Sequence, residues 1–251
     1  MKIGFIITAR MKSSRLKKKA TLKIHDRELI AWMIDRAKLM TSANNIIIAT
    51  SVNAQDDVLE EIAIREEVDF YRGSEEDVIE RLYESAKKFE LDFFINITAD
   101  CPLFGFDFFD DVISFYKQTN ADLITSMDLP HGFFIYGVKT SALKQVIDNK
   151  NIKETEVWGT LFNKDMFNVK DMPVNKDLIR ENFRLTVDYP EDFKLFQEVF
   201  EGLGENTYKK TTQEIIAFLD LHPEIVAINQ ECRDMYKKKW TEQQEKTKKL
   251  G

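Results

Sequence analysis

Basic side chains gather in one short segment near the N-terminus, residues 8–19, which holds two arginines, two serines and several lysines but no acidic residue. The segment directly follows an apolar run, Ile3 to Ile7, that predicts a buried first strand. Loops at the carboxyl ends of parallel strands bind ligands in α/β folds, and cationic and hydroxyl groups there donate strong hydrogen bonds to phosphates. The position therefore favours a polyphosphate site over a solvated basic turn.

Two aspartates follow strand-like runs in a similar way. Asp100 comes just after the run 93–97, and Asp188 comes just after 184–187 and two residues before Pro190. Because Mg²⁺ prefers oxygen ligands and is commonly held by one or two carboxylates together with substrate phosphates, this pair favours a metal–nucleotide site. A capping role stays open for both aspartates, and the place of Asp188 before Pro190 suits an N-cap.

A third segment, residues 71–77, follows a short strand-like run and opens a helical pattern. Gly73 allows close backbone approach to a ligand, and Ser74 can cap the helix or bond to a base or ribose. Among the three histidines only His131, beside Gly132 in a predicted loop, is a candidate ligand contact. The chain has no GxGxxG, no GxxxxGK[ST] and no DxD, which excludes the dinucleotide and P-loop motifs.

Composition narrows the class of partner. A net charge of −7 argues against general nucleic-acid binding, so the basic segment suits a small anionic ligand. Cys101 and Cys232 match no disulfide framework and no metal spacing. With no apolar stretch of signal-peptide or membrane-spanning length, we expect a cytoplasmic protein with no membrane partner.

The first half of the chain alternates strand-like and helix-like segments. The apolar runs lie at 3–7, 46–49, 70–71, 93–97 and 123–125. Helical apolar stripes lie at 29–37, 58–62 and 78–89, with a further helix expected at 107–116. This order predicts an α/β fold with a mainly parallel, Rossmann-like sheet, helices on both faces and right-handed crossovers.

The second half is less regular. We expect a strand at 133–138, a helix at 141–147, a strand at 183–187 and a helix from Pro190. Residues 1–230 are predicted to form one domain, in which 130–182 is an irregular region for ligand or subunit contact. Residues 231–251 form a charged tail to which we assign no function.

Four motifs occur in an order that resembles the nucleotide-sugar cytidylyltransferases, including those that activate 3-deoxy-manno-octulosonate and N-acylneuraminates. Within these enzymes, the chain is most similar to the subgroup named for a spore coat polysaccharide biosynthesis protein, which typically begins Ala-Arg-Met-x-Ser-Ser-Arg-Leu-Pro-x-Lys. The motifs are Ala9–Lys19, Arg72–Val78, Ile97–Leu103 and Arg184–Asp192.

The resemblance implies a fold of the nucleotide-diphospho-sugar transferase type and transfer of CMP from CTP to a small acidic acceptor. Mg²⁺ is the implied cofactor, held by Asp100 and Asp188, and Arg10, Lys19 and Asp100 are the implied catalytic residues. The implied substrate-binding residues are Ala9, Arg10, Ser13, Arg15, Lys19, Arg72, Gly73, Ser74, Thr98, His131 and Tyr136. Relatives of this kind are often dimers, so a homodimer is expected.

Departures from the family pattern fall mainly on the acceptor side. Tyr136 stands where many relatives carry glutamate, and Glu154–Trp158 stands where relatives often have Arg-Glu-His-Val. In the basic segment, Lys17 and Lys18 replace Pro-Gly. The acceptor therefore stays open between a sugar acid and a phosphorylated or phosphonate compound. A metal-dependent glycosyltransferase and a non-catalytic nucleotide-binding relative remain alternatives.

Overall fold

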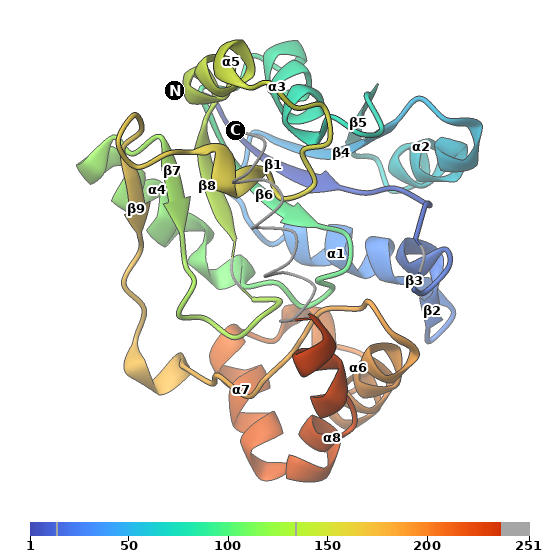
Figure 1. Cartoon of the computed structure of the whole chain (residues 1–251). Coiled ribbons are helices and arrows are strands. Elements are labelled where there is room, and N and C mark those ends of the chain that lie inside the picture. The colour runs from blue at the N-terminus through green and yellow to red at the C-terminus, as the bar shows by residue number, and fades with distance from the viewer. Residues whose placement is uncertain (14, 134, 237–251) are drawn as a thin grey trace.

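A seven-stranded mixed sheet forms the centre of the molecule in the computed structural model, which describes residues 1–13, 15–133 and 135–236 (Figure 1). The strand order is β5-β4-β1-β6-β8-β7-β9. The strands of this sheet are β1 (Ile3–Thr8), β4 (Asn45–Ser51), β5 (Asp69–Gly73), β6 (Phe93–Thr98), β7 (Leu123–Thr125), β8 (Tyr136–Lys139) and β9 (Val169–Asp171). A separate hairpin joins β2 (Lys23–Ile24) to β3 (Arg27–Glu28).

Parallel pairing dominates the sheet, as the alternation of apolar runs predicts. β1 pairs in parallel with both β4 and β6, and β4 pairs in parallel with β5. β8 is the exception, because it runs antiparallel to both β6 and β7. The carboxyl ends of β1 and β6 meet at one edge, where Thr8 is in register with Thr98.

Helices cover both faces of the sheet because the strands are apolar on both sides. Along β1, Phe5 and Ile7 belong to one core cluster and Ile6 to the other. α3 and α5 lie over one face, and α1 and α4 lie over the opposite face (Figure 1). The helices are α1 (Leu29–Ala37), α2 (Asp57–Arg65), α3 (Val78–Lys88), α4 (Phe109–Thr119), α5 (Thr140–Asn149), α6 (Pro190–Leu203), α7 (Thr212–Leu221) and α8 (Pro223–Ala227).

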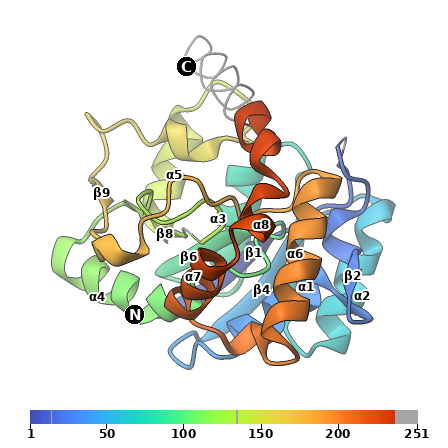
Figure 2. The same ribbon diagram turned by 90° about the horizontal axis from the view of Figure 1, so that it is seen from below.

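The last three of these helices pack beyond α1 (Figures 1 and 2). Arg36 of α1 is fully buried and donates to the carbonyls of Phe104, Tyr208 and Lys210 at 2.6, 3.0 and 2.7 Å. Trp32 of α1 also packs on Phe200 of α6, with ring centroids 5.2 Å apart. These contacts fix the position of α6, and therefore of the residues that precede it.

One predicted strand is wrong, and another is present with different bounds. Residues 183–187 form no strand; they run beside the loops that follow β6 and precede β8, with one isolated parallel bridge between His131 and Arg184. The strand predicted at 133–138 is instead β8, at Tyr136–Lys139. In the segment 183–187, Phe183, Leu185 and Val187 are buried by surrounding loops and helices, and their alternation with polar residues imitates a strand although no ladder forms. Pro190 does begin α6, as predicted.

No helix in the described ranges has the length and apolar character needed to cross a bilayer. Ser14 of the first motif, Phe134 and most of the charged tail (237–251) lie outside the described residues.

Candidate active site

Asp100 and Asp188, here called the carboxylate pair, lie side by side although 88 positions separate them in the chain. The backbone N–H of Val187 donates to the carbonyl of Asp100 at 2.7 Å, which holds the two loops together. Lys19 Nζ lies between the two side chains, 2.6 Å from Asp100 Oδ2 and 2.9 Å from Asp188 Oδ1. The structure thus brings three of the predicted site residues into one cluster.

Gly132 makes this approach possible. Its φ of 107° is a conformation that favours glycine, and a Cβ there would collide with the carbonyl of Leu185. In the space left by the missing side chain, Leu185 N donates to the carbonyl of His131 at 2.6 Å. The segment leading to Asp188 therefore lies against the loop that carries His131.

Cations surround the carboxylate of Asp188. Arg15 lies 2.6 Å from Oδ1 and Arg184 lies 3.0 Å from Oδ2, while only 3% of Asp188 is exposed. Burial alone would raise the pKa of Asp188, but the charges of Lys19, Arg15 and Arg184 outweigh it and hold the pKa well below its usual range. Burial likewise acts to lower the pKa of Lys19, yet the carboxylate pair raises it above its ordinary value. Asp188 and Lys19 are therefore both ionised at neutral pH.

Arg10 is directed away from the carboxylate pair. Its guanidinium lies 3.4 Å from the carbonyl of Glu75 and 3.2 Å from Glu156 Oε1. Ala9 is buried, with its backbone N–H on Ala49, and Ser13 is partly exposed in the same loop. The basic segment therefore contacts two places. Arg10 binds Glu75 and Glu156, whereas Arg15 and Lys19 bind the carboxylate pair.

The predicted base and ribose residues lie on β5 and the loop after it, at the far side of β1 from β6. Arg72 pairs with Asp57 and Glu60 of α2, at 2.6 and 2.9 Å. Ser74 Oγ accepts from Asp77 N at 3.1 Å. Ser74 does not cap the helix as predicted, because α3 begins at Val78 and its N-cap is Asp77, whose side chain accepts from Glu80 N. The structure does not bring Arg72, Gly73 or Ser74 to the carboxylate pair, and their ligand contacts stay predictions.

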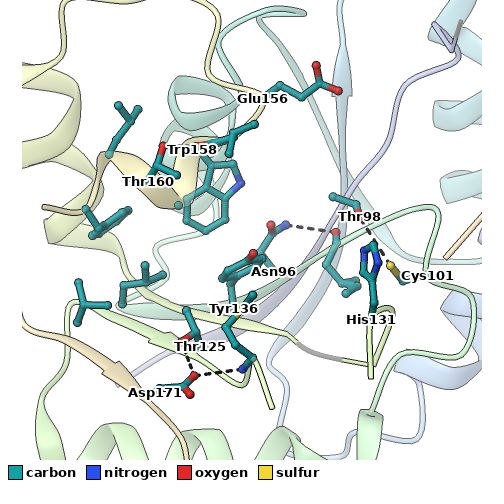
Figure 3. Close-up of a pocket in the computed structure, with 18 of the residues that line it drawn as sticks. Asn96, Thr98, Cys101, Thr125, His131, Tyr136, Glu156, Trp158, Thr160 and Asp171 are labelled. Atoms are coloured by element: carbon teal, nitrogen blue, oxygen red, sulfur yellow. Dashed lines mark hydrogen bonds between the residues drawn. The ribbon is translucent and has the colours of Figure 1, made fainter. Parts of the chain in front are cut away.

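A cavity of about 1490 Å³ extends from the carboxylate pair across β6, β8 and β7. Figure 3 shows Trp158 facing Asn96 and Tyr136, with His131 beside Thr98 and Cys101. The rings of Tyr136 and Trp158 are 5.1 Å apart, and Thr98 Oγ1 donates to Asp100 Oδ1. This cavity could hold a small molecule next to the carboxylates.

His131 is held as a neutral ring. Arg184 NH1 lies 3.3 Å from Nδ1, and because a guanidinium only donates, Nδ1 accepts and the ring proton lies on Nε2. Burial, reinforced by the Arg184 charge, lowers the pKa of His131 to about 4. His131 therefore contributes a neutral ring, with the proton on Nε2, to the wall of the cavity.

Stability should depend on pH through His131. An unfolded histidine titrates near ~6.5, whereas His131 in the fold titrates at about 4. Between these two values the unfolded chain binds more protons at this histidine than the folded protein does. The contribution of His131 to the free energy of unfolding is therefore complete above about pH 6.5 and is lost progressively as the pH drops toward about 4. Urea unfolding at about pH 7 and about pH 5 should give a smaller difference for His131→Gln than for wild type. Equal differences would show that His131 is not buried in this way.

The carboxylate pair is suited to bind a divalent cation, because its oxygens are of the right chemical type and point toward one place. One oxygen from each aspartate already lies within hydrogen-bond distance of a single positive charge, Lys19 Nζ. Carboxylate oxygens are hard ligands of the kind that Mg²⁺ prefers. Among the described residues no group of three or more His, Cys, Asp or Glu side chains could hold an ion. An ion at this pair would therefore take its other ligands from water or substrate.

Sequence reasoning missed Arg184, which contacts Asp188 and His131, and Tyr236, which lines the cavity. Arg184 is followed by Asp188 and Asp192 at positions i+4 and i+8, a spacing that could have indicated a buried ion-pair network. No pattern in the charged tail singles out Tyr236.

The sheet, its flanking helices and the site at its carboxyl edge define an α/β fold like that of the nucleotide-diphospho-sugar transferases. A family model described as cytidylyltransferase matches residues 4–239. The chain belongs to the cytidylyltransferase family, which confirms the predicted family and fold.

Two relatives are similar to the chain over most of their length. An uncharacterised protein of Methanocaldococcus jannaschii is 31% identical over 236 residues, covering 93% of this chain and 96% of that protein. The spore coat polysaccharide biosynthesis protein SpsF of Bacillus subtilis is 26% identical over 233 residues, covering 88% and 95%. The latter agrees with the subgroup predicted from the motifs.

Solved structures share the fold. A cytidylyltransferase from Leptospira borgpetersenii has a TM-score of 0.83 at 26% identity, covering 90% of this chain and 97% of that one. CMP:2-keto-3-deoxy-manno-octonic acid synthetase complexed with CTP has a TM-score of 0.66 at 16% identity, covering 81% and 100%. Rv0371c of Mycobacterium tuberculosis in complex with manganese has a TM-score of 0.58 at 13% identity, covering 79% and 99%. The last two show likeness of fold alone.

Proposed function

We propose that the protein is a Mg²⁺-dependent cytidylyltransferase that transfers CMP from CTP to a small acidic acceptor and releases pyrophosphate, for surface glycan biosynthesis. The observation that carries the proposal is the cluster of Lys19 and Arg15 on the carboxylate pair, at the carboxyl edge of the sheet. CTP is the nucleotide in the complex of a protein with the same fold. The similarity to SpsF, which is named for spore coat polysaccharide biosynthesis, supports the surface-glycan role.

In this mechanism the protein accelerates the reaction by positioning the two substrates and by neutralising the negative charge of the phosphates. An acceptor oxygen attacks the α-phosphorus of CTP in line, its proton leaves to solvent or base, and the bond to pyrophosphate breaks. Arg15 and Lys19 neutralise the triphosphate and the leaving pyrophosphate. Arg10 would join them only by leaving Glu156, which lies 3.2 Å from its guanidinium. Asp100 and Asp188 would hold Mg²⁺, which would supply Lewis-acid catalysis at the phosphates when bound.

The acceptor would occupy the cavity beside the carboxylate pair. Its walls combine the aromatic rings of Tyr136 and Trp158 with polar groups of Asn96, Thr98 and His131. The His131 ring carries its proton on Nε2 and accepts from Arg184 at Nδ1, so it suits donation to an acceptor oxygen better than proton abstraction. We therefore expect a sugar acid, a phosphorylated compound or a phosphonate.

A pyrophosphate-release assay tests the function directly. The protein with Mg²⁺ is incubated with CTP, ATP, GTP or UTP and a panel of keto-deoxy sugar acids, sugar phosphates and phosphonates. Pyrophosphate and a CMP-linked product from CTP are expected with at least one acceptor. Release of CDP or UDP from a nucleotide sugar would indicate a glycosyltransferase instead. If CTP raises the thermal unfolding temperature of the protein but no acceptor gives a product, the protein would be a non-catalytic nucleotide-binding relative.

Lys19 should compete with metal before the nucleotide binds. Its ammonium group neutralises the carboxylate pair, so Lys19→Met should bind Mn²⁺ about tenfold more tightly than wild type in the absence of nucleotide. Electron paramagnetic resonance titration of free Mn²⁺ measures this affinity without turnover. Lys12→Met, which removes a lysine 3.5 Å from Glu75, is the matched control. Weaker binding in Lys19→Met would contradict the assignment.

A further inference from the structure

Arg184 is the most enclosed cation of the site, with 1% of its side chain exposed. Two of its nitrogens bind the two oxygens of Asp192, at 2.9 and 3.0 Å, and NH2 also donates to Asp188 Oδ2 at 3.0 Å. Asp192 is itself held by Asn229 Nδ2 and by the backbone N–H groups of Asp188 and Tyr189. The orientation of the Asp188 carboxylate is therefore coupled to the position of one guanidinium.

Two aromatic rings contact this guanidinium. Tyr236 lies 4.8 Å from its central carbon and Tyr189 lies 5.8 Å from it. A planar guanidinium stacks favourably on aromatic rings, and the gain is larger where water is excluded. Tyr236 also packs on His131, with ring centroids 4.5 Å apart. One residue of the charged C-terminal segment thus contacts both Arg184 and His131.

Tyr236 reaches the site from the helical turns at 230–236, which continue beyond α8 (Figure 2). Cys232 in these turns is buried and lies 3.7 Å from Glu191 Oε2 of α6, which holds the segment against the rest of the fold. Arg233 and Tyr236 both line the cavity. The segment is therefore placed to form part of the cavity wall next to the carboxylate pair.

We propose that Tyr236 is a positioning residue, through which the C-terminal segment holds Arg184 and His131 and so sets the Asp188 carboxylate and the adjacent wall of the cavity. The inference rests on the proposed function, since it assigns Asp188 to metal and the cavity to the acceptor. Tyr236 itself carries out no bond-making step. Loss of its ring should loosen metal binding and acceptor binding while leaving the distant residues of the basic segment in place.

Three variants test this role. Tyr236→Leu removes the stacked ring, and Tyr236→Phe keeps it. Tyr83→Leu removes a ring from a comparable contact with Lys87, 5.9 Å away on α3 and far from the site. Each variant is titrated with Mn²⁺ in the presence of CTP, and the KM for acceptor and the kcat are measured where turnover occurs.

Tyr236→Leu is expected to weaken Mn²⁺ affinity in the CTP complex and to raise the acceptor KM, each about tenfold. Tyr236→Phe should recover most of both effects, and Tyr83→Leu should show neither. Unchanged Mn²⁺ affinity and acceptor KM in Tyr236→Leu would overturn the inference, as would equal losses in Tyr83→Leu. If wild type binds Mn²⁺ and CTP but transfers CMP to no acceptor, the proposed function fails while the Mn²⁺ titration still decides the role of Tyr236.

Discussion

Replacing Asp100 by asparagine is expected to lower CMP transfer by about a thousandfold, the scale of losing a group that stabilises developing charge. The amide keeps the shape of the side chain and can still accept from Thr98, which donates to Asp100 in the native protein. It removes the negative charge that faces Lys19 at 2.6 Å. In the proposed mechanism this charge would help to hold Mg²⁺ during transfer, so kcat should fall much more than CTP affinity.

Initial rates of pyrophosphate release, measured with saturating CTP and acceptor, give the effect. Asp148→Asn is the matched control, because Asp148 is also a lysine-paired carboxylate, 2.6 Å from Lys144 Nζ, but lies exposed on α5. The control should keep wild-type turnover. Wild-type turnover in Asp100→Asn would remove Asp100 from the mechanism.

Replacing Asp192 by alanine is expected to destabilise the fold by about 3–5 kcal/mol, because it leaves the Arg184 guanidinium buried without its bidentate partner. Asp192 is fully buried and also accepts from Asn229 and from two backbone N–H groups. Asp192→Asn, which keeps one acceptor oxygen, should lose less. Activity should fall as well, because Arg184 also contacts Asp188.

Urea unfolding at neutral pH measures this change in the free energy of unfolding. Asp220→Ala is the control, since Asp220 also binds an arginine through both oxygens, at 2.9 and 2.7 Å from Arg180, but the pair is partly exposed. Exposed pairs contribute about 1 kcal/mol or less. Similar losses for the two variants would show that the Arg184–Asp192 pair is not enclosed as described.

Local patterns were sufficient to predict the first half of the fold. The apolar runs at 3–7 and 93–97 are buried on both sides, so they mark central strands, and the polar residues that follow them mark the ligand edge. That is why the basic segment and Asp100 could be placed at this edge of the sheet from the sequence. Their contact depends on the parallel pairing of β1 and β6. The alternation of elements predicts a mainly parallel sheet but not which strands are neighbours.

The remaining parts depend on contacts between distant segments that leave no periodic pattern. Phe183, Leu185 and Val187 are buried by loops and not by a strand ladder, and the approach of this segment to Asp100 needs Gly132. Tyr236 stands in a strongly charged stretch whose packing depends on single aromatic and buried residues. Arg72 carries a family motif, yet its guanidinium pairs with α2, a partner that only the folded arrangement reveals.

A crystal structure with a non-hydrolysable CTP analogue and Mn²⁺ tests the central claim most directly. We expect an anomalous peak about 2.1 Å from one carboxylate oxygen of Asp100 and one of Asp188, with Lys19 and Arg15 turned to the triphosphate. A metal bound elsewhere, or a triphosphate that leaves these two aspartates paired with Lys19 as they are without ligand, would contradict the account.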